Sequence, residues 1–173
     1  MMKENFRLLR WLTIAAALLF AVLALVVFKK EPSQQDSEIG LSVSILNYTD
    51  QPLGVVYVND SWAGGMLIHG GGNSFAGSAS LPRKWRPGLT VRVDWRDDAL
   101  YQKDRDALHS AVVPVSPYTG NYPSILFVAF FPNQEIKVFP SSMGPGHPEF
   151  PEGLQRPETL CKANPICKEK FFD

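Results

Sequence analysis

The stretch LTVRVDWR, residues 89–96, decides the fold of this chain. Apolar residues alternate through it with charged or hydroxyl-bearing ones, so that Val91, Val93 and Trp95 fall on one side of an extended backbone. A period of two is the pattern of a β-strand with one face on a hydrophobic core. The stretch therefore predicts a half-buried strand with Val91, Val93 and Trp95 as core positions.

Other stretches on both sides of it also predict strands. The pair Asn59-Asp60 indicates a turn, and Pro114 suits a strand at the edge of a sheet. Residues 124–131, SILFVAFF, form a continuous apolar run that is typical of a strand buried on both faces, and residues 132–134 would turn it back into a hairpin. The further predicted strands are residues 41–48, 53–59, 111–115, 124–131 and 135–139.

Many short strands separated by turns favour a mostly β protein, with an antiparallel β-sandwich over residues 41–142. Only residues 98–109 look helical. Residues 143–173 are rich in proline and predict an extended tail, packed on the domain, with no more than one turn of helix. The predicted core includes Ile45, Val91, Val93, Trp95, Leu126 and Val128.

Composition excludes several classes of protein. The chain has 173 residues, enough for one domain, with 17 Lys+Arg against 17 Asp+Glu. This neutral balance is not that of a nucleic-acid binder. Two cysteines are too few for a four-cysteine zinc site. In an oxidising compartment, Cys161 and Cys167 predict a disulfide that closes a small loop; two free thiols are the alternative.

An apolar segment lies near the start of the sequence. Residues 11–28, WLTIAAALLFAVLALVVF, contain no charge and would span about 27 Å as a helix. A cleaved signal peptide needs a small-x-small site just after the apolar segment, and a lipoprotein needs a cysteine there. The sequence has neither at that place. We therefore expect residues 1–30 to be an uncleaved single-span membrane anchor, followed by a linker at residues 31–40.

Charge predicts how this anchor is oriented. Three basic residues, Lys3, Arg7 and Arg10, precede the apolar segment, and only one acidic residue, Glu4, lies among them. Because an excess of basic residues marks the cytoplasmic side of a membrane span, the N-terminus is expected inside the cell. This orientation predicts a single-pass protein of the inner membrane whose C-terminal domain lies in the periplasm.

No catalytic or metal-binding pattern stands out. Residues 72–77, GNSFAG, resemble the nucleophile elbow G-x-S-x-G, but the fifth position is Ala76 and a Gly-rich loop is the better interpretation. His69, His109 and His147 have no metal-ligand spacing and are interpreted as lone surface histidines. We expect no enzyme activity, no cofactor and no metal.

Partner binding has better candidates. Trp62 follows a turn pair and precedes two glycines in what is predicted to be a Gly-rich loop, so it is either an exposed aromatic anchor or a plug within that loop. Acidic and basic residues are interspersed just after the central strand at residues 89–96. Such a run of mixed charges is either a solvated face or a recognition patch. Arg96, Asp97 and Tyr101 should emerge there at a sheet end, and together with Trp62 they are the predicted partner-binding residues.

The stretch LPRKWRPGLTVRVDW, residues 81–95, resembles a family of bacterial envelope proteins catalogued as a domain of unknown function. Its W-x-P-G-x-x-V-x-V-x-W pattern is fairly specific, and the resemblance covers about residues 41–150. Further similar segments are Tyr57-Val58-Asn59-Asp60, Gly70-Gly71-Gly72, His109 with Val113-Pro114-Val115, and Phe130-Phe131-Pro132-Asn133-Gln134-Glu135 with Pro145 and His147-Pro148.

Members of that family commonly sit beside phospholipase effectors of the type VI secretion system and are interpreted as their immunity proteins. The resemblance implies a non-catalytic periplasmic protein that binds and inhibits a phospholipase effector of α/β-hydrolase type. Two features depart from the family: residues 77–80, GSAS, replace cysteines common in members, and an apolar segment replaces a lipid anchor. The alternative is a non-catalytic envelope assembly or ligand-binding module, such as a secretion-apparatus accessory protein.

Overall fold

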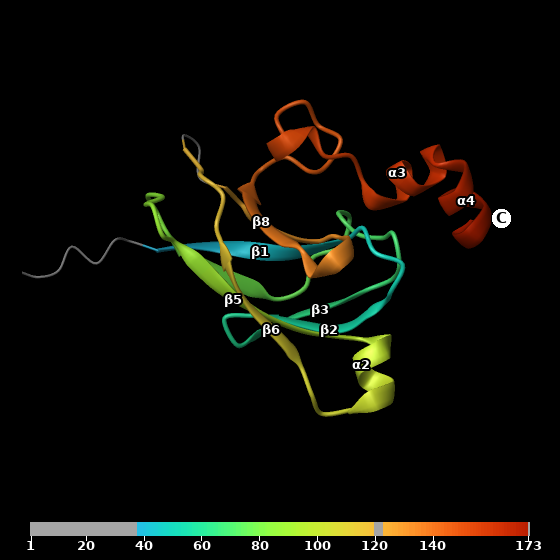
Figure 1. Ribbon diagram of the computed structural model, residues 1–173. Helices are drawn as coiled ribbons and strands as arrows, with labels where there is room; N and C mark the ends of the chain where they lie inside the picture. Colours follow the sequence, from blue (N-terminus) through green and yellow to red (C-terminus); the bar gives the residue numbers. More distant parts are fainter. Residues whose placement is uncertain (1–37, 120–122, 173) are drawn as a thin grey trace, which may run out of the picture. The chain divides into compact units, whose positions relative to one another are not determined.

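The computed structural model describes residues 38–119 and 123–172 as a mostly β fold with two four-stranded sheets (Figure 1). The predicted anchor at residues 1–30 lies outside the described residues, as does most of the predicted linker. Of the helices within residues 38–119 and 123–172, none has the length and hydrophobicity that a membrane span needs. The first sheet has the order β4-β1-β7-β8, formed by Ser78–Pro82, Glu38–Asn47, Ile125–Phe130 and Ile136–Ser141. The second has the order β3-β2-β5-β6, formed by Ser61–Met66, Leu53–Val58, Thr90–Asp97 and His109–Pro114.

The main hydrophobic core lies between the two sheets. The alternation in β5 directs Val91, Val93 and Trp95 inward, as predicted, and all three are buried. They belong to one cluster with residues of the facing sheet, the arrangement of a β-sandwich. Every predicted core residue is confirmed: Ile45, Val91, Val93, Trp95, Leu126 and Val128.

A second, smaller core covers the outer face of the first sheet. Phe127 and Phe139 point away from the main core and meet Phe150 of the C-terminal segment, with ring centres 5.1 and 5.9 Å from it. The Tyr48 hydroxyl donates a hydrogen bond to the Gln155 carbonyl at 2.7 Å, and burial raises the pKa of this phenol. The strand predicted to be buried on both faces is therefore confirmed, because the C-terminal segment supplies its second cover.

The prediction of a purely antiparallel sandwich is wrong at one pair of strands. β1 and β7 pair in parallel, with Val43 beside Leu126 and Ile45 beside Val128. A parallel pair needs a crossover connection, and here the whole second sheet lies between the two strands in the sequence. The other strand pairs are antiparallel, including the predicted hairpin of β7 and β8, which turns at η1 (Pro132–Gln134).

Strand boundaries also differ from the prediction. β1 begins at Glu38, inside the stretch expected to be linker, and β4 was not predicted. β3 forms where a Gly-rich loop was expected, because the predicted turn at Asn59-Asp60 closes a tight hairpin. Both turn residues have positive φ, 46° and 66°, which is the backbone that joins strands through two residues.

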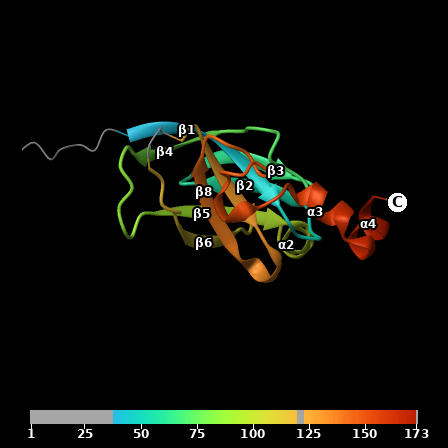
Figure 2. The same cartoon turned by 90° about the horizontal axis from the view of Figure 1, so that it is seen from above.

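The helices differ most from the prediction. α2 (Asp98–Lys103) occupies only the first half of the predicted segment. The C-terminal segment contains η2 (Pro151–Gly153), α3 (Pro157–Ala163) and α4 (Pro165–Phe171), so the expectation of an extended tail with at most one helical turn is wrong. Pro157 and Pro165 each occupy the start of a helix. At that position the backbone N–H that proline lacks would have no partner within the helix, so no helix hydrogen bond is lost. Both views place α3 and α4 beyond one end of the strands (Figures 1 and 2).

Candidate functional site

The outer face of the second sheet carries the predicted partner-binding residue Trp62. Because Val91, Val93 and Trp95 point into the core, their neighbours on β5 point outward, and so do the residues paired with them. The C-terminal segment packs on the other sheet, so this face keeps large exposed side chains, with Trp62 57% and Val112 69% exposed. We call it the open face and define it as Val55, Tyr57, Trp62, Arg92, Asp94, Arg96 and Val112.

Trp62 lies in a strand rather than in the Gly-rich loop that the sequence predicted. It stands on β3, at the edge of the sheet, directly opposite Tyr57 of β2. The short turn at Asn59-Asp60 fixes this register. Because its side chain is more than half exposed, Trp62 does not plug a loop.

Arg96 lies on the same face as Trp62, on the other side of β2. It is paired with Val55, two residues from Tyr57 along β2. Standard strand spacing and rise then put the Trp62 and Arg96 backbones about 12 Å apart. Both residues fit within one interface of ordinary size, which takes about 800 Å² from each partner.

The centre of the open face is an ion-pair network that the sequence did not predict. Arg92 Nε donates to Asp94 Oδ2 at 2.8 Å, and Arg92 Nη2 pairs with Asp60 on the β2–β3 turn. The hydrogen bond to Asp94, followed by the charge of Asp60, raises the pKa of the Arg92 guanidinium. The pair with Asp60 is exposed and contributes little to stability, whereas the Asp94 side chain is only 12% exposed; both pairs orient charge on the face.

Asp97 has a structural role. It caps α2, where its Oδ1 accepts a hydrogen bond from the Leu100 N–H at 2.8 Å. Its Oδ2 lies 3.4 Å from His109 Nε2. His109 in turn stacks on Trp95, with ring centres 5.1 Å apart.

The Tyr101 ring packs against two arginine side chains, one from β5 and one from the segment after α2. The Arg96 and Arg105 guanidinium carbons lie 5.3 and 5.4 Å from the centre of its ring, within cation–π range. Within residues 38–119 and 123–172, neither guanidinium lies in an ion pair. The structure therefore brings Arg96 and Tyr101 together as the sequence suggested, and it adds Arg105, which sequence reasoning missed.

A pocket of about 400 Å³ opens at the same end of the strands. Trp95, Phe130 and Leu53 line it together with Asp97 and Asp50, so its wall is mainly apolar with two carboxylates in the lining. No sequence pattern marked this pocket, because its lining comes from three separate segments of the chain. These are residues 49–53, the end of β5, and residues 130–134, which run from the end of β7 into the turn that follows.

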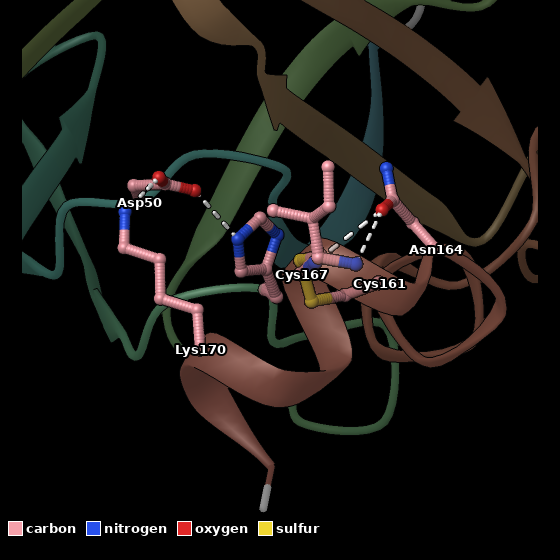
Figure 3. Close-up of a disulfide and its surroundings, with 7 residues drawn as sticks. Asp50, Cys161, Asn164, Cys167 and Lys170 are labelled. Atoms are coloured by element: carbon pink, nitrogen blue, oxygen red, sulfur yellow. Dashed lines mark hydrogen bonds and ion pairs between the residues drawn. A yellow bond between two sulfur atoms is a disulfide. The ribbon is translucent and has the colours of Figure 1, made fainter.

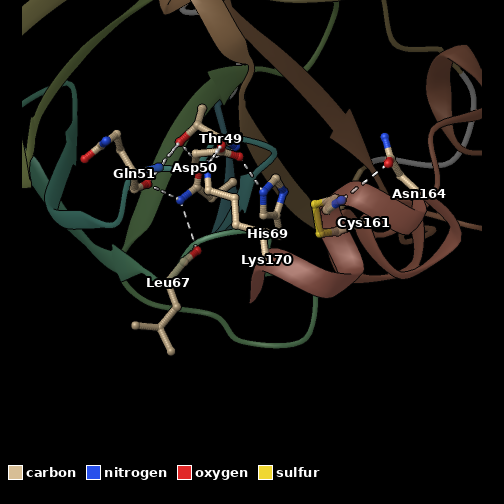
Figure 4. A network of polar contacts seen from close by, with 10 residues as sticks. Thr49, Asp50, Gln51, Leu67, His69, Cys161, Asn164 and Lys170 are labelled. Carbon is tan, nitrogen blue, oxygen red and sulfur yellow. Dashed lines mark hydrogen bonds and ion pairs between the residues drawn. A yellow bond between two sulfur atoms is a disulfide. The ribbon is translucent and has the colours of Figure 1, made fainter. Parts of the chain in front are cut away.

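The predicted disulfide is confirmed and has an unexpected neighbour. Cys161 and Cys167 are joined, with Cα atoms 5.1 Å apart, and they link α3 to α4 (Figure 3). His69 lies beside them and is only 8% exposed, so its interpretation as a lone surface histidine is wrong. Figure 4 shows His69 between Asp50 and the disulfide.

A chain of polar contacts runs from His69 to the end of the C-terminal segment. His69 Nε2 lies 2.8 Å from Asp50 Oδ1, and Lys170 Nζ donates to Asp50 Oδ2 at 2.7 Å. The Lys170 hydrogen bond is the main cause that lowers the pKa of the Asp50 carboxyl. The His69 and Phe171 rings also pack together, with centres 5.0 Å apart. These contacts dock α4 on the sandwich.

Comparison with known proteins gives one match. Residues 46–138 match the model of a family described as "Protein of unknown function (DUF3304)". No curated protein and no solved structure matches the chain. The matched segment runs from within β1 to within β8 and contains every residue of the open face. Because the match covers more than half of the chain, this protein belongs to the DUF3304 family of proteins of unknown function.

Proposed function

We propose that this protein is a non-catalytic binding protein that holds a partner protein on its open face. The observation that carries the proposal is the exposure of Trp62 and Val112 beside the ordered Arg92 network. Trp, Tyr and Arg are the residue types that dominate the energetics of protein interfaces. A sheet face also presents them on a rigid scaffold, so little ordering is needed on binding.

The proposed partner is a phospholipase effector of α/β-hydrolase type. The resemblance of residues 41–150 to envelope proteins interpreted as lipase immunity proteins supports this choice of partner. In the proposal, residues 11–28 anchor the chain in the inner membrane and hold the domain in the periplasm. The open face then covers the mouth of the lipase active site and denies the enzyme access to lipid.

The charges of the open face suit this role. The network of Arg92, Asp94 and Asp60 places both signs close together, and the stack at Tyr101 adds two guanidinium groups without carboxylate partners among the described residues. Mixed charges beside an aromatic residue raise the encounter rate and exclude wrong partners more than they add affinity.

A second candidate function is a ligand-binding module of the cell envelope. The pocket of about 400 Å³ at the strand ends favours it, because its wall combines Trp95 and Phe130 with the carboxylate of Asp97. Ligand sites are commonly mainly apolar with few polar groups. This function needs no partner protein on the open face.

An inhibition assay tests the first proposal. The full chain in mild detergent is mixed with a phospholipase effector of α/β-hydrolase type, and fatty-acid release from phospholipid is measured. We expect stoichiometric inhibition by wild type, and Trp62→Ala should need roughly 30-fold more protein. Ile166→Ala, at a 78% exposed position on α4, is the matched control and should inhibit as wild type does. A lipase that stays fully active with folded wild type overturns the proposal and leaves the ligand-binding module.

A further inference from the structure

We propose that reduction of the Cys161–Cys167 disulfide creates a binding site for Zn²⁺, with both thiolates and His69 as its protein ligands. The inference is independent of partner binding on the open face. It begins from a cluster of ligand atoms, since one atom each of His69, Cys161 and Cys167 lie within 4.8 Å of one another. His69 comes from the loop after β3, far in sequence from the two cysteines, so the folded chain brings the three together.

The geometry needs only a local change. Two thiolates at about 2.3 Å from a tetrahedral Zn²⁺ lie about 3.8 Å apart, so the sulfurs must separate once their bond is broken. Space for this lies alongside, in a pocket of about 290 Å³ lined by His69, both cysteines, Tyr48 and Asn164. The same pocket can admit a water as the fourth ligand, the coordination of zinc sites with three protein ligands.

His69 is already oriented as a metal ligand. Its Nε2 faces Asp50 at 2.8 Å, and the other ring nitrogen lies on the side of the disulfide (Figure 4). When Nε2–H donates to the carboxylate, Nδ1 carries the free lone pair that a metal requires. Carboxylate–histidine pairs of this kind commonly support zinc ligands. Lys170 holds the other Asp50 oxygen at 2.7 Å and fixes the carboxylate in place.

Burial favours a specific site over loose binding. His69 is 8% and Cys161 3% exposed, so an ion bound there loses little affinity to competing water. Among the residues that the structure describes, Asp50 and Lys170 are the charged side chains that hydrogen bonds join to His69 or to its carboxylate partner. The two thiolates then neutralise the charge of Zn²⁺.

The chemistry balances with a dithiol reductant. Two thiols of the reductant supply two electrons and two protons, the Cys161–Cys167 bond breaks into two thiols, and the reductant becomes a disulfide. Zn²⁺ then displaces the two thiol protons as it binds both sulfurs. The ion would replace the disulfide as the link between α3 and α4.

Metal titration of the full chain in mild detergent tests the proposal. After reduction and removal of the reductant under anaerobic conditions, Zn²⁺ is titrated against a chromophoric chelator. Co²⁺ serves as a spectroscopic probe, because thiolate ligands give it a charge-transfer band. We expect one equivalent of Zn²⁺ per reduced chain, a thiolate–Co²⁺ band, and no binding by the oxidised chain.

Two variants and one control decide which residues bind. His69→Gln should weaken Zn²⁺ binding by at least about 10-fold, and Asp50→Asn, which keeps all three ligands, by about 10- to 100-fold. His147→Gln, a histidine outside the cluster, should bind as wild type does. Circular dichroism of each oxidised variant checks its fold. Reduced wild type that binds no Zn²⁺, or a folded His69→Gln that binds as tightly as wild type, overturns the proposal.

Discussion

Trp62 stands directly opposite Tyr57 across the β2–β3 hairpin, with both side chains on the outer face of the second sheet. This pair exists because Asn59 and Asp60 both take positive φ and close the hairpin in two residues. A turn longer by one residue would move Trp62 to the core side. The turn thus determines whether Trp62 lies on the open face.

The turn itself gives a stability prediction. Asp60 has a φ of 66°, which glycine adopts freely and a β-branched residue does not. We expect Asp60→Val to lower the free energy of unfolding by about 1–2 kcal/mol, and Asp60→Gly to change it by less than about 0.5 kcal/mol. Urea denaturation checks this, and equal losses in the two variants would contradict it, because both remove the pair with Arg92.

Trp95 should be the costliest position of the core to truncate. Its ring is buried and contacts both His109 and Phe130, with ring centres 5.1 and 5.6 Å away. We expect Trp95→Ala to lower the free energy of unfolding by about 3–5 kcal/mol, since it leaves a large cavity. Trp62→Ala is the matched control and should cost less than about 1 kcal/mol. A loss below about 1 kcal/mol at Trp95 in denaturant unfolding would show that the ring does not support the core.

The disulfide should stabilise the C-terminal helices more than the sandwich. It closes a short loop, with a sequence separation of 6, for which the chain-entropy model gives about 2 kcal/mol. We expect Cys161→Ser with Cys167→Ser to speed amide hydrogen exchange in α3 and α4. Exchange in β7, which lies in the doubly covered sheet, should stay slow. Unchanged exchange in α4 would mean that His69, Asp50 and Lys170 dock it without the disulfide.

The Asp50 carboxyl gives a pH prediction. Its pKa is lowered in the folded state, mainly by Lys170, so its contribution to stability is present above the ordinary pKa of an aspartate. That contribution is lost as the pH falls through the lowered pKa. The effect is small, because the side chain is half exposed. We expect Lys170→Met to bring the pKa of Asp50 back toward its ordinary value in an NMR titration, and an unchanged pKa would contradict the assignment.

The sequence predicted the strands that repeat with period two or form an apolar run, such as β5 and β7. It missed β3, because residues 61–66 contain two adjacent glycines that indicate a loop. The parallel pairing of β1 with β7 could not be predicted, since no local pattern specifies which distant strand becomes a neighbour. Prolines in the C-terminal segment indicated extended chain, but two of them begin helices.

The candidate site was predictable only in part. Trp62, Arg96 and Tyr101 stood out by residue type, and the structure places Arg96 against Tyr101. Asp97 remains a predicted partner-binding residue, but its role as a helix cap was not predicted, because a cap and an exposed acid look alike in sequence. The contact of His69 with the disulfide joins segments more than ninety residues apart, and no spacing rule reaches that far.

The central claim is that the open face binds a partner protein through Trp62. Its most direct test is calorimetric titration of the proposed partner, a phospholipase effector of α/β-hydrolase type, with full-length wild type, Trp62→Ala and Ile166→Ala, each checked for folding. We predict that wild type and Ile166→Ala bind equally and that Trp62→Ala loses about 2 kcal/mol, roughly 30-fold in affinity. Binding of Trp62→Ala with the affinity of wild type, or no binding of the lipase by folded wild type, would contradict the account.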